Sequence, residues 1–228
     1  MDSDPTGHKA ALPARRATRG LVLIQWWLGL GTTLFFALPY LRRAHGLSRL
    51  DRRRRHLFVC NHVSLLDTIL LGSLCWQAGC LPILVLGDKS VWRANWIKTM
   101  LSSKIGFLLE RGRFNPKRIE ELRAFARCHQ EFQLIVFPEG TRGDGTNVKA
   151  CQPGIYYIAQ EARLPLVPVF FRNMELISTK TGPLHLFSGL RKVEVHFAPS
   201  VEPDEYLHLS REDFLEFVRN KIAAAREQ

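Results

Sequence analysis

Short apolar runs alternate along this chain with longer segments in which apolar positions recur at helical spacing. Short continuous or alternating apolar runs predict strands, and apolar residues three and four positions apart predict helices. The predicted strands cover residues 57–60, 82–86, 107–109, 134–137, 166–171 and 193–197, and the predicted helices cover residues 65–77, 90–100, 115–132 and 154–163. Ser210, with Asp213 three residues later, predicts the start of a C-terminal helix. This alternation indicates an α/β fold with a mixed β-sheet flanked by helices.

Pro168 stands inside the predicted strand at residues 166–171. Because proline has no backbone N–H to give to a strand ladder, it is confined mostly to edge strands, first strand positions and bulges. We therefore expect this strand to lie at an edge of the sheet or to contain a local irregularity.

Residues 21–40 form a largely apolar stretch without a charged residue. This is about the length that a helix needs to cross a bilayer. We expect residues 21–41 to form a membrane-anchoring or spanning helix, between a flexible basic N-terminus at residues 1–20 and a folded domain at residues 45–228. A spanning helix, a half-inserted helix or bent hairpin, and a soluble core helix remain open as alternatives.

The charge of the chain limits its partners. The formal net charge is +11 and the sequence pI is about 9.9, which suits nucleic acid, an anionic membrane or an acidic substrate. No zinc-finger or RNP-like motif is present, so we expect anionic lipid and phosphate ligands and no nucleic acid. Basic residues are more numerous after the apolar stretch than before it, which favours a cytoplasmic position for the folded domain.

The five cysteines predict a reducing environment. Their number is odd and they form no C-x-x-C pair, a pattern that favours free thiols. Cys60 lies in a predicted strand, where we expect it to serve as a small buried hydrophobe.

The first candidate for chemistry is the run from Asn61 to Asp67, directly after the predicted strand at residues 57–60. His62 and Asp67 would lie at a strand-to-helix corner, where side chains are accessible. A histidine oriented by a carboxylate can act as a general base on a hydroxyl. Taken alone, such a pair is more often a helix-capping or surface contact than a catalytic one.

A second cluster follows the predicted strand at residues 134–137. The chain continues as Pro138-Glu139-Gly140-Thr141-Arg142 and then Gly143-Asp144-Gly145, a polar, glycine-rich loop. In open α/β sheets, ligands bind beyond the carboxyl ends of the strands, where loops of this kind form the site.

Together the two clusters resemble one family. The run from His62 to Asp67 matches the HxxxxD signature, and the run from Phe137 to Arg142 matches the FPEGTR signature, of the glycerolipid acyltransferases. The chain is most similar to the bacterial 1-acyl-sn-glycerol-3-phosphate (lysophosphatidate) acyltransferases. Residues 106–111 resemble the family block that ends in a substrate-binding arginine, and residues 166–169 resemble its short apolar block with an internal proline.

The resemblance implies a fold, a reaction and a site. Residues 45–228 would form an acyltransferase domain that moves a fatty acyl group from acyl-ACP or acyl-CoA to the hydroxyl of lysophosphatidate, giving phosphatidate. His62 would be the general base and Asp67 the residue that orients it. The implied substrate-binding residues are Arg111, Glu139, Gly140, Thr141 and Arg142.

The resemblance also sets the expected partners. These are the membrane bilayer, a lysophospholipid acceptor and an acyl carrier protein or coenzyme A thioester. No cofactor and no metal are expected, because the remaining histidines have no ligand spacing in the sequence. The expected location is a bacterial inner membrane, with the catalytic domain on its cytoplasmic side.

Three alternatives remain. The first is an acyltransferase for another acceptor: lyso-ornithine lipid, another lysophospholipid or glycerol 3-phosphate. The second is a noncatalytic membrane-binding module, which the presence of both His62 and Asp67 disfavours. The third is a Ser/His/Asp lipid hydrolase, which would need a nucleophile elbow such as G-x-S-x-G, and the sequence has none.

Overall fold

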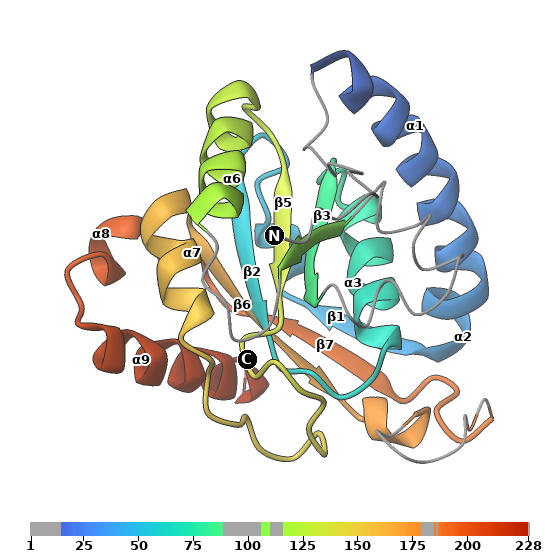
Figure 1. The fold of residues 1–228 in the computed structure, drawn as a ribbon. Coiled ribbons are helices and arrows are strands. Elements are labelled where there is room, and N and C mark those ends of the chain that lie inside the picture. The colour runs from blue at the N-terminus through green and yellow to red at the C-terminus, as the bar shows by residue number, and fades with distance from the viewer. Residues whose placement is uncertain (1–14, 89–105, 110–115, 179–184, 186, 228) are drawn as a thin grey trace, which may run out of the picture.

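The computed structural model describes residues 15–88, 106–109, 116–178, 185 and 187–227. Its centre is a seven-stranded sheet in the order β1-β7-β6-β2-β5-β3-β4 (Figure 1). The strands are β1 (Leu41–His45), β2 (His56–Cys60), β3 (Ile83–Asp88), β4 (Gly106–Leu109), β5 (Gln133–Val136), β6 (Leu166–Arg172) and β7 (Val193–Phe197). Neighbouring strands are parallel except for the antiparallel pair β6 and β7. The predicted mixed α/β sheet is confirmed.

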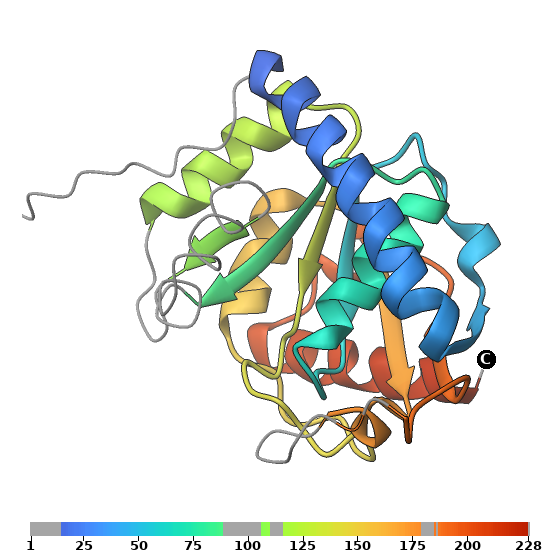
Figure 2. The same ribbon diagram turned by 90° about the vertical axis from the view of Figure 1, so that its right-hand side faces the viewer.

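Helices cover both faces of the sheet (Figures 1 and 2). On one face lie α1 (Arg15–Thr32), a π-helical turn (Thr33–Ala37), α2 (Leu38–Tyr40) and α3 (Leu66–Gln77). On the other lie α6 (Pro116–Cys128), α7 (Gly154–Ala162) and α9 (Arg211–Ala224), with α8 (Pro203–Tyr206) close to α7. Short 3-10 turns occupy Leu47–Arg49, Met174–Leu176 and Ala225–Glu227. The backbone N–H of Asp213 donates to the side chain of Ser210, so the predicted start of α9 is confirmed.

The centre of the sheet is buried on both sides, which explains the continuous apolar runs in the sequence. Alternate residues of β2 enter two different cores. Leu57 and Val59 join the cluster beneath α6, α7 and α9, whereas Phe58 and Cys60 join the cluster beneath α3. Every residue of β2 is buried, so this strand is a rigid support for the residues that follow it.

Most predicted elements match the structure within a few residues at each end. The predicted helix at residues 90–100 lies outside the described residues. The helix expected at residues 115–132 ends at Cys128. Of the two alternatives predicted from Pro168, the edge position is wrong, because β6 lies between β2 and β7. Pro168 is tolerated because its missing N–H falls where β7 ends, and its carbonyl oxygen accepts from the N–H of Ala198 just past that strand.

One face of α1 is fixed to the domain by specific contacts. The side-chain amide of Gln25 bonds both backbone groups of Ile83, with N···O distances of 2.6 and 2.7 Å. The hydroxyls of Thr33 and Ser73 lie 2.7 Å apart. A Cβ atom at Gly29 would lie 2.3 Å from the ring of Trp76, so the absence of a side chain there permits the close approach of α1 to α3.

The same helical segment also carries many large apolar side chains that are exposed. Its exposed residues are Leu23, Ile24, Trp26, Trp27, Leu28, Leu34, Phe35 and Leu38. Among the residues that the structure describes, the segment Gly20–Tyr40 is the one helix whose length and composition would allow it to cross a membrane. Contiguous exposed apolar surface of this kind marks a site of association with a membrane or another protein.

Candidate active site

The site is built where two parallel strands end. β2 and β5 are neighbours, and Val59 is registered with Val136. The carboxyl ends of the two strands therefore lie side by side. Asn61 and His62 follow β2 there, and Phe137 and Pro138 follow β5. The two sequence clusters, far apart along the chain, are brought together by this register.

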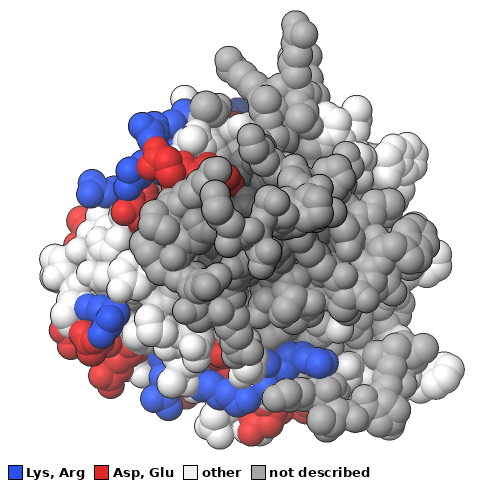
Figure 3. All heavy atoms as spheres, viewed as in Figure 1, with Lys and Arg blue, Asp and Glu red and all other residues white. Residues whose placement is uncertain are grey.

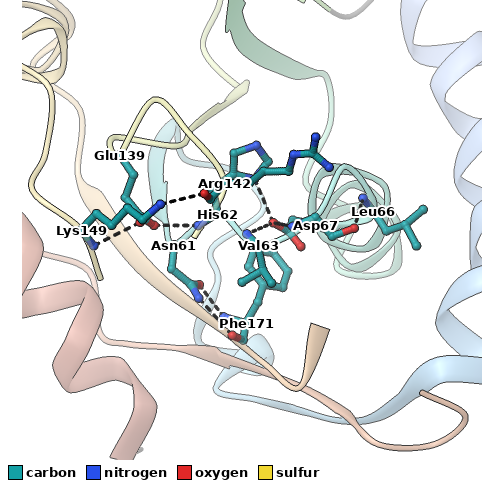
Figure 4. Close-up of polar contacts among 10 residues, drawn as sticks. Asn61, His62, Val63, Leu66, Asp67, Glu139, Arg142, Lys149 and Phe171 are labelled. Atoms are coloured by element: carbon teal, nitrogen blue, oxygen red, sulfur yellow. Dashed lines mark hydrogen bonds and ion pairs between the residues drawn. The ribbon is translucent and has the colours of Figure 1, made fainter. Parts of the chain in front are cut away.

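His62 and Asp67 form a direct hydrogen bond (Figure 4). The distance from His62 Nδ1 to Asp67 Oδ2 is 2.9 Å. Asp67 is completely buried in the first turn of α3, whereas 16% of the His62 side chain remains exposed. A carboxylate at this position favours the tautomer with its proton on Nδ1, which leaves the lone pair of the second ring nitrogen, Nε2, free.

The local backbone holds the Asp67 carboxylate in place. Oδ2 also accepts the N–H groups of Val63 and Ser64, at 2.7 and 2.8 Å, while Oδ1 is buried without a hydrogen-bond partner. Burial raises the pKa of Asp67 above its ordinary value, and the hydrogen bond from His62 and the backbone donors oppose that shift. The carboxylate is thus fixed by three donors on one oxygen.

Glu139 joins the two clusters. Its Oε1 accepts the backbone N–H of His62 at 2.8 Å, and its Oε2 accepts the backbone N–H of Lys149 at 3.1 Å. The residue is 3% exposed, and burial raises the pKa of its carboxyl against the effect of these hydrogen bonds. Glu139 therefore acts as a brace between the loop after β2 and the loop after β5.

The loop after β5 also closes over His62 through its backbone. The N–H of Gly143 donates to the carbonyl oxygen of His62 at 2.5 Å, and Lys149 Nζ donates to the carbonyl oxygen of Arg142 at 2.8 Å. Gly140 turns the loop at φ +64°, a conformation that favours glycine, and its N–H donates to the carbonyl oxygen of Phe137. Arg142 is held on this loop beside His62 (Figure 4).

Asn61 fixes the other side of the His62 loop. Its side-chain amide pairs with both backbone groups of Phe171 in β6, at 3.0 and 2.7 Å. The ring of Phe137 stacks on the imidazole of His62 with ring centres 4.3 Å apart. The imidazole is thus held by packing as well as by its hydrogen bond.

The predicted site residues fall into two groups. His62, Asp67, Glu139, Gly140, Thr141 and Arg142 lie together at the carboxyl edge of β2 and β5, whereas Arg111 lies outside the described residues. Lys149 also belongs to the site, through its contacts with Glu139 and Arg142, and the sequence does not predict these contacts. Its position after a glycine-rich loop is too weak a signal to reveal them.

Two other groups near His62 are unsuited to nucleophilic attack. Ser64 is fully buried, and its hydroxyl accepts the N–H of Leu66. Cys60 is fully buried as predicted, and burial raises the pKa of its thiol well above the ordinary value. The described part of the chain contains the free, buried cysteines Cys60, Cys75, Cys80 and Cys151.

Basic and acidic side chains of the described residues lie near one another on one face of the molecule (Figure 3). Figure 3 shows one face, on which the Lys and Arg side chains of described residues form separate groups beside Asp and Glu rather than one continuous patch.

Fold and site together define an α/β protein with a histidine–carboxylate pair over the carboxyl ends of its central strands. A family model described as "Acyltransferase" matches residues 42–172. The chain therefore belongs to the acyltransferase family, and the resemblance seen in the HxxxxD and FPEGTR runs is confirmed.

Curated relatives carry related names. The lyso-ornithine lipid O-acyltransferase of Pseudomonas aeruginosa is 32% identical over 147 residues, which are 64% of this chain and 52% of that protein. A 1-acyl-sn-glycerol-3-phosphate acyltransferase of Cocos nucifera is 29% identical over 134 residues, 56% of this chain and 41% of that protein. The chain thus spans about half the length of these two relatives.

A solved structure shares the fold. The 1-acyl-sn-glycerophosphate (LPA) acyltransferase PlsC of Thermotoga maritima superposes with a TM-score of 0.64 at 20% identity, covering 95% of this chain and 83% of that one. The match extends over nearly the whole chain, so it includes the N-terminal helical segment as well as the sheet.

Proposed function

We propose that this protein transfers a fatty acyl group from an acyl thioester to the free hydroxyl of lysophosphatidate, forming phosphatidate. The observation that carries the proposal is the hydrogen bond between His62 and Asp67 at the edge where the FPEGTR loop meets β2. Relatives named 1-acyl-sn-glycerol-3-phosphate acyltransferase support the choice of acceptor.

In the proposed reaction His62 is the general base. Asp67 holds the proton on Nδ1, so Nε2 takes the proton of the acceptor hydroxyl as its oxygen attacks the thioester carbonyl carbon. The tetrahedral intermediate then collapses with cleavage of the carbon–sulfur bond, and His62 returns the proton to the departing thiolate. The transfer is direct, so it requires no nucleophile on the protein.

Among the residues that the structure describes, Arg142 is the cation that we propose binds the acceptor phosphate. Its loop is bonded to His62 through the backbone of Gly143, so the backbone of Arg142 is held close to that of His62. A guanidinium can grip a phosphate through two parallel hydrogen bonds. Arg111 is a second candidate through the family resemblance alone.

A second acceptor has a specific observation in its favour. The relative from Pseudomonas aeruginosa, at 32% identity, is named for a lyso-ornithine lipid. The proposed chemistry at His62 is the same for both acceptors, and only headgroup contacts would differ. The donor is acyl-ACP or acyl-CoA, both of which present the same thioester carbonyl.

The N-terminal segment is proposed to bind the membrane by one face. Gln25 and Thr33 are committed to contacts with the domain, whereas Trp27 and Phe35 on the other face are 68% and 74% exposed. A helix fastened to the domain along one side suits half-insertion in one leaflet better than a free span. Such a position would present the site to lipid at the cytoplasmic surface of a bacterial inner membrane.

The experiment that tests the assignment measures acyl transfer by the purified protein in nanodiscs. Lysophosphatidate and lyso-ornithine lipid are each offered with acyl-CoA and with acyl-ACP. We expect phosphatidate from the wild type, and a KM for lysophosphatidate raised about 10- to 100-fold in Arg142→Gln, as loss of a charge-assisted contact implies. Arg53→Gln, at an exposed arginine in the turn before β2, is the control and should leave KM unchanged.

Either of two results would change the assignment. Acylation of lyso-ornithine lipid alone would keep the chemistry and replace the acceptor. Absence of acyl transfer to both acceptors from both donors would contradict the proposed reaction.

A further inference from the structure

A histidine pair and a carboxylate meet at the far side of the sheet from β5. His45 in β1 is registered with His196 in β7, and their rings stack with centres 4.3 Å apart and planes 12° from parallel. Glu194 lies two residues before His196, so it projects from the same face of β7. β6 separates this group from β2 and the proposed active site.

His196 is the unusual member of the group. It is 5% exposed, and neither of its ring nitrogens has a hydrogen-bond partner. Buried polar atoms are nearly always bonded, so an imidazole with two unpartnered nitrogens calls for an explanation such as a water or an ion.

The three side chains offer a convergent ligand set. One ligand atom from each of His45, Glu194 and His196 lies within 4.8 Å of the others, and His196 Nε2 is 3.6 Å from Glu194 Oε2. Tetrahedral Zn²⁺, with ligands at about 2.0 to 2.2 Å, requires ligand atoms roughly 3.3 Å apart. To bind one ion, the two imidazoles would have to rotate out of their stacked arrangement until the plane of each ring passes through the ion, and this rotation would also bring the ligand atoms together.

Two arginines share Glu194. Arg42 Nη1 lies 3.3 Å from its Oε1, and Arg172 Nη1 lies 3.7 Å from its Oε2. Their side chains are 69% and 49% exposed, so both guanidinium groups can turn into water when a cation binds. Exposed ion pairs of this kind are weak competitors for a metal ligand.

We propose that His45, Glu194 and His196 form a binding site for a divalent transition-metal ion, with Zn²⁺ as the ion that two imidazoles and one carboxylate favour. Water would complete the fourth position. The site is structural, since it lies apart from His62 and Asp67. It joins β1 to β7, and β1 follows directly after α2, so the ion would fasten the strand that leads out of the apolar helix to the rest of the sheet.

The sequence does not predict this site, because its ligands are far apart along the chain. His45 and His196 come from opposite ends of the folded domain, and the spacing rules for zinc sites look for ligands close together along the chain. Only the parallel pairing of β1 with β7 brings them together.

The test is metal binding by the full chain in detergent, after removal of any histidine tag and treatment with a chelator. Zn²⁺ is titrated by calorimetry, Co²⁺ by its visible absorption, and Mg²⁺ serves as the hard-cation comparison. We expect one Zn²⁺ per chain, no comparable Mg²⁺ binding, and a rise in thermal midpoint on addition of Zn²⁺.

Variants assign the ligands. His45→Ala, Glu194→Gln and His196→Ala should each weaken Zn²⁺ binding at least about 10-fold, whereas His208→Ala, at an exposed histidine beyond β7, should bind as the wild type does. If His196→Ala does not fold, His45→Ala and Glu194→Gln decide the question. Failure of the wild type to bind Zn²⁺, or binding unaffected by these substitutions, would overturn the proposal without touching the acyltransferase assignment.

Discussion

The Nδ1 atom of His62 lies 2.9 Å from Oδ2 of Asp67, and the same carboxylate oxygen holds the two backbone N–H groups that follow the histidine. One buried oxygen thus fixes both the imidazole and the loop that carries it. The other oxygen, Oδ1, has no partner and makes no such contribution. The two roles of Asp67, structural and electrostatic, can therefore be separated by substitution.

Asp67→Asn is expected to fold and to lose activity. The amide oxygen can replace Oδ2 as acceptor and the NH₂ group can occupy the position of the unpartnered Oδ1, but the neutral side chain cannot stabilise an imidazolium. We expect kcat to fall about 10²- to 10⁴-fold. The free energy of unfolding at pH 7 should change little, because the variant no longer buries a charge but places the amide N–H donors where Oδ1 has no hydrogen-bond partner.

Urea unfolding and single-turnover acyl transfer on the same preparation would check both parts. Full activity in folded Asp67→Asn would show that the negative charge of Asp67 is not used in the reaction.

Glu139→Ala should disturb the position of His62 without removing a group that takes part in the reaction. It leaves the backbone N–H groups of His62 and Lys149 without their acceptor, at a cost of about 1 to 3 kcal/mol for each that stays buried and unpaired. Glu139→Gln keeps one acceptor oxygen, so its free energy of unfolding should fall by roughly half as much as that of Glu139→Ala. Because Glu139 positions His62, we expect kcat to fall more than KM changes. A change confined to KM would instead indicate direct contact with the acceptor.

Two helix glycines provide a matched pair for the docking of α1. A Cβ at Gly29 would meet the side chain of Trp76 at 2.3 to 2.8 Å, whereas a Cβ at Gly31 would meet no atom within 4 Å. We expect Gly29→Ala to lower the free energy of unfolding by about 1 to 3 kcal/mol through overpacking. Gly31→Ala should raise it by up to about 1 kcal/mol through helix propensity. Equal thermal shifts of the two variants would mean that α1 does not rest on α3 in solution.

The exposed apolar face should govern binding to membranes. Trp27→Ser with Phe35→Ser removes two large side chains that are 68% and 74% exposed in the folded protein. Each buried aromatic contributes about 1.5 to 3 kcal/mol, so liposome partitioning should fall at least about 100-fold in sedimentation assays. High salt should change that difference little. Partitioning equal to that of the wild type would place the membrane contact elsewhere.

Stability should fall in mild acid because of His56. Its Nδ1 lies 2.8 Å from Gln133 Oε1, it is 3% exposed, and burial lowers its pKa. Between that lowered pKa and about 6.5 the unfolded chain binds more protons than the folded one, so stability is lost as pH falls through this window. The loss stops growing once the pH is below the pKa of His56 in the folded protein, because both states are then protonated.

Urea unfolding at pH 7.5 and pH 5.5 would measure this effect. His56→Asn keeps an amide donor for Gln133 and should lose less stability over the interval than the wild type. His208→Asn, at an exposed histidine, should follow the wild-type slope. A His56→Asn slope equal to that of the wild type would remove His56 as the cause.

The strands that support the site are predictable because they lie in the centre of the sheet. Burial on both faces makes β2 and β5 continuous apolar runs, and the motif residues follow directly at their ends. The contact between Glu139 and the backbone of His62 is not predictable, because it depends on the register of Val59 with Val136. Register between distant strands leaves no mark in the local pattern.

The edges of the sheet are harder to predict for a related reason. β1 contains Arg42 and Arg43 and has no apolar alternation, because an edge strand beside solvent does not need it. Pro168 indicates an edge strand but lies in an interior one, since only the neighbouring end of β7 had to accommodate the missing donor. Local propensity is outweighed by where the adjacent strand stops.

The most direct test of the account is the rate of acyl transfer by His62→Ala under single-turnover conditions, with the fold checked by thermal unfolding and with His208→Ala as control. The account predicts that His62→Ala keeps its thermal transition and loses about 10²- to 10⁴-fold in the transfer step, while His208→Ala matches the wild type. Transfer at the wild-type rate by folded His62→Ala would contradict the assignment of His62 as the general base.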